Sequence, residues 1–231
     1  MNNHSDQSKE RFQFRNLARQ EDLDRFFYKY SKSMLPFPVN GKNMMLDLGC
    51  GMAEFARFTT ENGWNTSVSD VSEDNVKHAL EIGIDAKHLD LNLPIPYNDK
   101  SFNLVSLIEV LEHIMNAETL VEEIHRVLAD DGCFLLSTPN YAFYKHRLNG
   151  LWGKSPPEEG KHFRFFIRRK LKKILDSRGF RIVERNSFGY VPLFNKILCR
   201  KMRGKEKIRF HIPYILETLF AEHFVWLLKK S

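Results

Sequence analysis

A short apolar strand, a turn with two glycines and a helix, in that order, constrain the fold of this chain more than any other feature. The stretch runs from Met44 to Ala56 and reads MMLDLGCGMAEFA. The strand covers 44–48 and contains an acidic residue, and Gly49 and Gly51 form the turn that follows. A strand that turns over glycines into a helix is typical of a nucleotide-binding element in an α/β sheet.

The spacing of this turn discriminates between cofactors. Dinucleotide-binding turns follow the pattern G-x-G-x-x-G, but Glu54 stands here in place of the third glycine. A carboxylate at that position would repel a pyrophosphate, whereas it would not repel a cofactor that carries positive charge and no phosphate. The turn therefore favours S-adenosylmethionine over NAD.

Strand and helix patterns alternate regularly after the turn, which predicts a parallel sheet with helices on both faces. A last strand is expected at 224–228. The other expected strands are 44–48, 66–70, 84–89, 102–108, 132–137 and 180–185, and the expected helices are 53–62, 73–81, 117–128 and 168–178.

Length and composition narrow the class of protein further. A chain of 231 residues supports one sizeable domain, with or without an appendage. Three cysteines without metal-site spacing argue against a disulfide framework and for a reducing compartment. The first residues lack the apolar core of a signal peptide, and no run approaches the roughly 18 apolar residues of a membrane span. We therefore expect a cytoplasmic protein without a transmembrane segment.

The net charge of +6 conceals a strong asymmetry. Residues 1–142 hold 13 Lys and Arg against 22 Asp and Glu, whereas residues 143–212 hold 20 against 5. The basic segment predicts an anionic contact: an anionic acceptor, RNA, or a membrane surface to which the protein is peripheral. The other interpretation is a solvated basic surface without a specific partner.

The sequence LDLGCG, from Leu46 to Gly51, resembles the first motif of class I S-adenosylmethionine-dependent methyltransferases. This resemblance implies a Rossmann-like sheet of seven strands, the seventh inserted antiparallel. Residues 137–185 are similar to a branch of that family associated with quinone and methionine biosynthesis and with surface-polysaccharide clusters.

Loops at the carboxyl ends of the first four strands are expected to hold the cofactor. Asp70 ends the second strand and can accept hydrogen bonds from both ribose hydroxyls, and Val71 can pack on the adenine. Asp90 and Leu91 resemble the family's third-strand motif, which implies contacts to the adenine amino group and ring. Taken singly, Asp70 also reads as a helix cap and Asp90 as a turn residue.

The resemblance also assigns residues to the methionine end of the cofactor. The turn itself is expected to approach the methionine portion, and the end of the fourth strand is expected to lie beside the sulfonium. The residues concerned are Asp47, Gly49, Cys50, Gly51, Ile108 and Glu109.

The stretch EVLEH places Glu109, Glu112 and His113 at i, i+3 and i+4, on one face of an expected helix. Two carboxylates and an imidazole provide either a base with its orienting partner or ligands for a divalent metal. The stretch is similar to a motif of quinone-biosynthesis O-methyltransferases and small-RNA 2′-O-methyltransferases, which implies a Mg or Mn site with His162 as fourth ligand. His113 and His162 are thus the candidate catalytic residues.

The alternative is that Glu112 and His113 only brace the loop. We favour it because many methyltransferases carry EVLEH without evident metal use. A further set of residues reads equally well as acceptor contacts or as loop anchors: Asn140, Tyr141, Tyr144, His146 and Arg164.

The expected organisation has four parts: an N-terminal tail and helix (1–40), the cofactor-binding core (41–186), a basic helical cap (187–222) and the last strand (223–231). Three functions remain open. The first is O-methylation of a hydroxyl on an anionic, glycan-like or small-molecule acceptor. The second is metal-dependent RNA 2′-O-methylation, and the third is a cofactor-binding partner protein without turnover.

Overall fold

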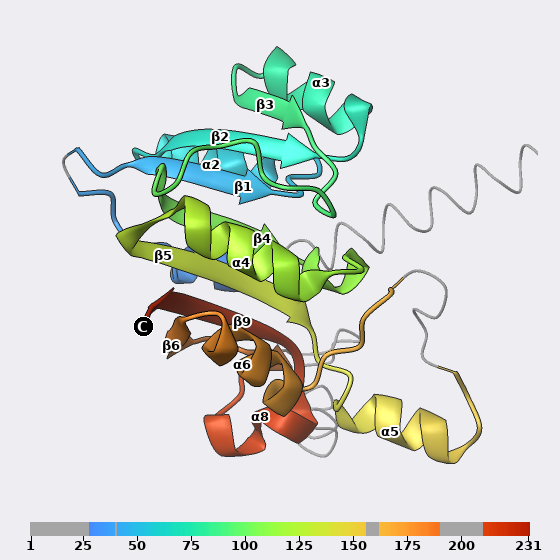
Figure 1. The fold of residues 1–231 in the computed structure, drawn as a ribbon. Helices are drawn as coiled ribbons and strands as arrows, with labels where there is room; N and C mark the ends of the chain where they lie inside the picture. The colour runs from blue at the N-terminus through green and yellow to red at the C-terminus, as the bar shows by residue number, and fades with distance from the viewer. Residues whose placement is uncertain (1–27, 40, 156–161, 190–209) are drawn as a thin grey trace, which may run out of the picture.

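The computed structural model describes residues 28–39, 41–155, 162–189 and 210–231, and all structural statements refer to these residues (Figure 1). A helical turn covers 28–33, so most of the expected N-terminal helix lies outside the described residues. The same holds for residues 190–209 of the expected basic cap.

One sheet organises the described chain, and its strand order runs β3-β2-β1-β4-β5-β9-β7-β8, with β6 also paired to β9. The first five strands are mutually parallel. β9 lies antiparallel between β5 and β6, which confirms the expected fold class with its antiparallel last strand. The strands are β1 (Met44–Leu48), β2 (Asn65–Asp70), β3 (Asp85–His88), β4 (Phe102–Ile108), β5 (Leu128–Pro139), β6 (Phe180–Arg185), β7 (Phe188–Gly189), β8 (Phe210–His211) and β9 (Ala221–Lys230).

Helices cover both faces of the sheet, as the alternation predicts. α4 and α6 lie on the face turned to the viewer in Figure 1, and α2 lies behind the sheet. The helices are α2 (Glu54–Glu61), α3 (Glu73–Glu81), α4 (Ala117–Val127), α5 (Tyr144–Leu151), α6 (Arg168–Ser177) and α8 (Tyr214–Phe220), and η1 (Leu111–His113) is a 3-10 turn.

Successive side chains of the central strands point to opposite faces of the sheet and pack in two apolar cores. Leu46 and Val105 pack with α4 and α6 on one face, whereas Met45 and Leu104 pack with Phe55 of α2 on the other. Both faces of β1 and β4 carry apolar residues because helices cover both sides of the sheet, and Asp47 and Ser106 interrupt these apolar strands. The sheet therefore holds the loops at its carboxyl edge in fixed positions.

Several boundaries differ from the sequence-based expectations. The helix expected directly after β4 is only the single turn η1, because the backbone at Glu109 adopts a left-handed φ of 57° that ends the regular structure. α5 is not among the helices expected from the sequence. β9 begins at Ala221 instead of 224, and the described part of the expected cap holds two short strands as well as helix α8.

Candidate cofactor and active site

The glycine turn after β1 depends on both of its glycines, for different reasons. Gly49 has a φ of 76°, and a Cβ added there would lie 2.4 Å from the Val110 Cγ2 atom. Gly51 has a φ of 52°, and a Cβ added there would meet nothing within 4 Å. Gly49 thus packs tightly against the segment after β4, whereas Gly51 borders open space in which a ligand can approach the backbone.

Asp70 lies beside this turn, at the end of the neighbouring strand. Its Oδ2 accepts a hydrogen bond from the Gly51 amide at 2.9 Å, and its Oδ1 accepts one from the Ser72 amide at 2.9 Å. The side chain of Ser72 caps α3, so Asp70 is not the cap of that helix. A carboxylate has four lone-pair sites, so Asp70 keeps the capacity to accept from a ligand hydroxyl.

The loops after β2 and β3 are tied together. The Leu89 amide donates to the Asp70 carbonyl at 3.0 Å, and His88 Nε2 lies 2.9 Å from the Val71 carbonyl. The side chain of Val71 is 68% exposed beside them. Val71 is therefore available for an apolar contact next to Asp70, as the adenine assignment requires.

Asp90 and Leu91 differ in accessibility. Asp90 is exposed and accepts hydrogen bonds at 2.9 Å from the backbone and side-chain nitrogens of Asn92, which lower the pKa of its carboxyl. Leu91 is buried and packs in the same core as Leu46. Asp90 therefore both forms a turn and faces solvent, whereas the side chain of Leu91 serves the core.

Two further residues of the turn are buried. Burial raises the pKa of Asp47 to about 6, although Ser106 Oγ donates a hydrogen bond to its carboxylate. Burial also raises the pKa of Cys50 to about 12, so that its thiol stays protonated. Only the backbone of Cys50 can contact a cofactor, because its side chain packs with Ala53 and Val68.

The end of β4 presents Glu109 in a constrained geometry. Its backbone has a φ of 57°, which is unfavourable for a residue with a Cβ atom. Its carboxylate accepts a hydrogen bond from Ser137 Oγ, and Oε2 lies 3.0 Å from His223 Nδ1. His223 was not predicted from the sequence, because it lies on β9 and reaches the site only through the pairing of His223 with Pro139.

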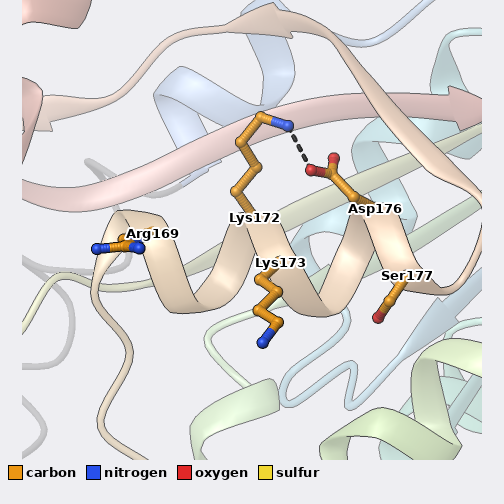
Figure 2. A pocket seen from close by; sticks show the side chains of 5 residues that line it. All are labelled: Arg169, Lys172, Lys173, Asp176 and Ser177. Atoms are coloured by element: carbon orange, nitrogen blue, oxygen red, sulfur yellow. Dashed lines mark hydrogen bonds and ion pairs between the residues drawn. The ribbon is translucent and has the colours of Figure 1, made fainter.

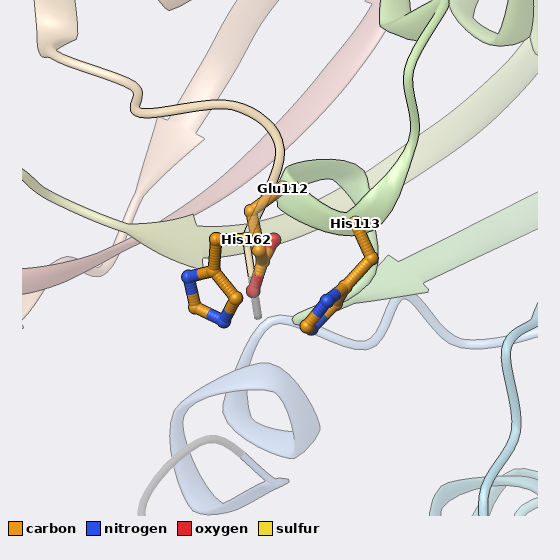
Figure 3. Close-up of side chains that lie close together, drawn as sticks. All are labelled: Glu112, His113 and His162. Atoms are coloured by element: carbon orange, nitrogen blue, oxygen red, sulfur yellow. The ribbon is translucent and has the colours of Figure 1, made fainter. Parts of the chain in front are cut away.

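A second group of side chains gathers around η1. Glu112, His113 and His162 each offer one ligand atom, and these atoms lie within 4.8 Å of one another (Figure 3). The rings of His113 and His162 are 4.5 Å apart between centroids. Glu109 does not belong to this group, which corrects the expected face of three residues: the left-handed bend at Glu109 points its carboxylate to Ser137 and His223 instead.

The chemistry of this group suits a cation. Glu112 is 1% exposed, and burial, with Glu109 nearby, raises its pKa well above the usual value, although Thr138 Oγ1 donates to it at 2.9 Å. A cation held by Glu112 and the two imidazoles would keep the carboxylate ionised, and carboxylate with imidazole is a common ligand set for divalent metals. The group therefore fits a metal. It also fits the bracing role, because the backbone carbonyl of Glu112 accepts a hydrogen bond from the Phe163 amide at 2.9 Å and so anchors the loop that carries His162.

Two of the candidate acceptor contacts are loop anchors. Asn140 is fully buried, and its Nδ2 donates to three carbonyls around the end of α8, the shortest to Ala221 at 2.8 Å. Arg164 donates to the Met115 carbonyl at 2.9 Å and pairs with Glu118. Tyr141 remains at the site, because its Oη lies 2.5 Å from His162 Nδ1.

A separate, shallow hollow lies on the outer surface of α6 (Figure 2). It is lined by Arg169, Lys172, Lys173, Asp176 and Ser177, and Lys172 pairs with Asp176 across it. It contains none of the predicted site residues. Three basic residues that line it, Arg169, Lys172 and Lys173, show that part of the basic segment lies on the solvent-facing side of α6.

The comparisons agree with this geometry. Residues 15–185 match the family model described as Methyltransferase domain, so the chain belongs to the methyltransferase-domain family. A probable S-adenosylmethionine-dependent methyltransferase of Mycolicibacterium smegmatis is 30% identical over 141 residues, which cover 60% of this chain and 52% of that protein. The mitochondrial ubiquinone biosynthesis O-methyltransferase of Dictyostelium discoideum is 24% identical over 187 residues, which cover 71% of this chain and 58% of that protein.

A solved structure shows the same fold. The S-adenosylmethionine-dependent methyltransferase of Thermotoga maritima, described as a possible histamine N-methyltransferase, aligns with a TM-score of 0.65 at 17% identity over 95% of this chain and 97% of that one. The chain spans little more than half the length of the two curated relatives.

The domain is thus a class I, Rossmann-like methyltransferase domain whose cofactor is S-adenosylmethionine. The acidic residues at the turn, Asp47 and Asp70, and the open space at Gly51 fit this cationic, phosphate-free cofactor. No helix within the described ranges has both the length and the hydrophobicity to cross a bilayer.

Proposed function

We propose that this protein transfers a methyl group from S-adenosylmethionine to a hydroxyl oxygen of an anionic, glycan-like or otherwise small acceptor in the cytoplasm. One observation carries the proposal: Glu112 follows Val110, which packs against Gly49 of the glycine turn, by two residues, and the ligand atoms of Glu112, His113 and His162 lie within 4.8 Å of one another. Groups that accept a proton thus stand close to where the methyl donor would be held. The likeness to ubiquinone biosynthesis O-methyltransferases supports a small-molecule hydroxyl acceptor.

Each part of the site has a role in this proposal. Bound S-adenosylmethionine supplies an activated methyl group. Asp70 and Asp47 hold the polar parts of the cofactor, Val71 covers its base, and Glu109 presents a fixed carboxylate at the end of β4. Most of the rate gain of such a transfer comes from alignment of donor and acceptor, and a base helps when the acceptor is protonated.

We assign the base to the imidazole pair, with His162 as the first candidate. Tyr141 fixes the ring through Nδ1, and Glu112 lies beside it in a buried position. If a divalent metal is bound, Glu112, His113 and His162 would hold it, and it would make an acceptor hydroxyl more acidic. Activity that is unchanged by EDTA and by added Mn²⁺ would limit these residues to the base and bracing roles.

A turnover screen tests the proposal. The release of S-adenosylhomocysteine is measured with hydroxyl acceptors, namely catechols, sugar phosphates and glycans, and with matched amines and O-methylated versions of the same compounds. We expect turnover only where a hydroxyl is present, and His162→Gln should lower it more than tenfold. Turnover with the amines alone would contradict O-methylation.

The basic residues of α6 favour a second candidate, RNA 2′-O-methylation. In that case RNA would bind with a steep dependence on salt, and methylation would stop when the target 2′-hydroxyl is replaced by hydrogen. A chain that binds S-adenosylhomocysteine, turns over none of the acceptors and co-purifies with a stable partner would instead be the cofactor-binding partner protein.

A further inference from the structure

The helix α5 projects away from the sheet (Figure 1). Apolar side chains are exposed near its C-terminal end. Leu148, Leu151 and Trp152 are 48%, 81% and 79% exposed, and we call these three residues the α5 tip. They stand at i, i+3 and i+4, so they share one side of the helix. α5 itself contains no buried residue. Tyr144 and His146 attach the beginning of α5 to the rest of the protein, whereas the exposed apolar residues at its other end indicate a partner outside the described residues.

The charges around the α5 tip limit what that partner can be. Lys145, Arg147 and Lys154 are all exposed, and residues 141–155 contain no Asp or Glu. An anionic partner is therefore favoured over a neutral one.

An apolar tip with exposed lysine and arginine residues within a few positions in the sequence matches the surface of an anionic bilayer. Tryptophan and leucine enter the headgroup region while lysine and arginine contact lipid phosphates. The phosphates of a nucleic acid would pair with the cations, but they offer no apolar surface for the two leucines at the tip. A second copy of the chain would bring the same cations face to face, which is unfavourable.

We propose that the α5 tip attaches this protein to an anionic lipid surface. The attachment goes beyond the proposed methyl transfer and does not depend on it. It would place the site at the membrane, because α5 is linked to that site through the stacked rings of His146 and Tyr141, 5.4 Å apart, and Tyr141 contacts His162. An acceptor carried in the lipid would then lie close to the imidazole pair.

The neighbouring helix α8 also exposes an apolar residue. The rings of Tyr144 and Phe220 are 5.9 Å apart, so α5 begins where α8 ends. Ile215 of α8 is 85% exposed. Ile215 is therefore a second apolar residue whose contribution to attachment can be measured.

The chain carries its own probe of attachment. It contains three tryptophans, of which Trp64 and Trp226 are buried and Trp152 is exposed. The full chain is mixed with vesicles of phosphatidylcholine, with and without 30% phosphatidylglycerol, and with a brominated lipid as fluorescence quencher. We expect flotation with the anionic vesicles only, a blue shift of the emission, and quenching by the brominated lipid that Trp152→Phe removes while the protein still floats.

Variants locate the contact. Leu151→Ser with Trp152→Ser should weaken vesicle binding more than tenfold, and each of Lys145→Gln and Lys154→Gln should weaken it about fivefold at low salt. The matched control is Leu80→Ser with Lys77→Gln on α3, where exposed residues of the same types lie at the other end of the sheet, and it should bind vesicles like the wild type.

Three results would overturn the proposal. They are absence of flotation, flotation that the serine variants do not weaken, and shielding of Trp152 from iodide in dilute protein without lipid, which would mean that another part of the chain or a second copy covers it. Binding of S-adenosylhomocysteine is measured on the same variants, so that loss of attachment and failure of the cofactor site are separated.

Discussion

The imidazole of His223 lies 3.0 Å from the carboxylate of Glu109, and this contact joins the antiparallel strand β9 to the end of β4. The two residues are far apart in the sequence and meet because β9 pairs with β5, which in turn pairs with β4. Glu109 also has a left-handed backbone and a second contact to Ser137. A strained residue held by several contacts is typical of a functional position.

The pair can be tested by a double-mutant cycle. Side chains in direct contact are coupled by about 0.5 to 3 kcal/mol. We expect His223→Leu and Glu109→Gln each to lower the free energy of unfolding, and the double variant to lose about 1 kcal/mol less than the sum, as measured by urea denaturation. Strictly additive losses would show that the contact does not contribute to stability.

The two glycines of the turn should respond differently to alanine. Gly49→Ala forces a Cβ against Val110 and should destabilise the domain by at least about 2 kcal/mol. In Gly51→Ala the added Cβ has no protein atom within 4 Å, so we expect only about 1 kcal/mol of destabilisation from backbone strain. The same Cβ would occupy the space where the ligand approaches, so we expect the affinity for S-adenosylhomocysteine to fall more than tenfold. Thermal unfolding and calorimetric titration of both variants check this contrast, and equal cofactor affinity in Gly51→Ala and wild type would contradict the placement of the ligand.

Asp47 should make stability depend on pH. Its pKa is about 6 in the folded protein against an ordinary value of 3.8, so the folded state holds a proton that the unfolded state releases between pH 4 and 6. Stability from this group is therefore lost as the pH rises through that window, by up to about 3 kcal/mol above pH 6.

Asp47→Asn should remove this loss. We expect the variant to be more stable than the wild type at pH 7, equal to it near pH 4, and weaker in cofactor binding. Denaturation at both pH values provides the test, and Ser106→Ala is the control, since loss of its hydrogen bond should destabilise the ionised wild-type aspartate further at pH 7. Equal destabilisation of Asp47→Asn at both pH values would contradict this account of Asp47.

Asn140 should prove structural. Its side chain donates to three carbonyls around the end of α8, and two of the acceptor residues, Glu217 and Ala221, are buried with it. Asn140→Ala leaves the carbonyls without this donor and should cost about 2 to 4 kcal/mol. Asn140→Asp should cost more, because a carboxylate would face the same carbonyls. Thermal unfolding measures the stability of both variants. If it equals that of the wild type, Asn140 is not a structural anchor and is again a candidate acceptor contact.

Local patterns predicted most of the sheet, because hydrophobic alternation and glycine turns are local signals. The positions of Gly49, Gly51 and Asp70 followed from the same signals, since a parallel sheet brings strand ends together. The helical face expected for Glu109, Glu112 and His113 was wrong, because one left-handed residue separates Glu109 from the turn that carries the other two. The role of His223 had no local signal, because it depends on the register of β9 against β5.

The sequence also did not show whether Asn140 and Arg164 are loop anchors or acceptor contacts. A polar side chain after a strand reads alike whether it faces a ligand or a buried carbonyl, and only packing distinguishes the two. α5 was missed because its short sequence has no strong helical periodicity and no buried face.

Calorimetric titration with S-adenosylhomocysteine tests the central claim, a cofactor site at the glycine turn, most directly. We expect saturable heat with one site per chain, strongly reduced in Asp70→Ala while the variant remains folded. The absence of heat from the wild type at millimolar ligand, or equal binding by Asp70→Ala, would contradict the account.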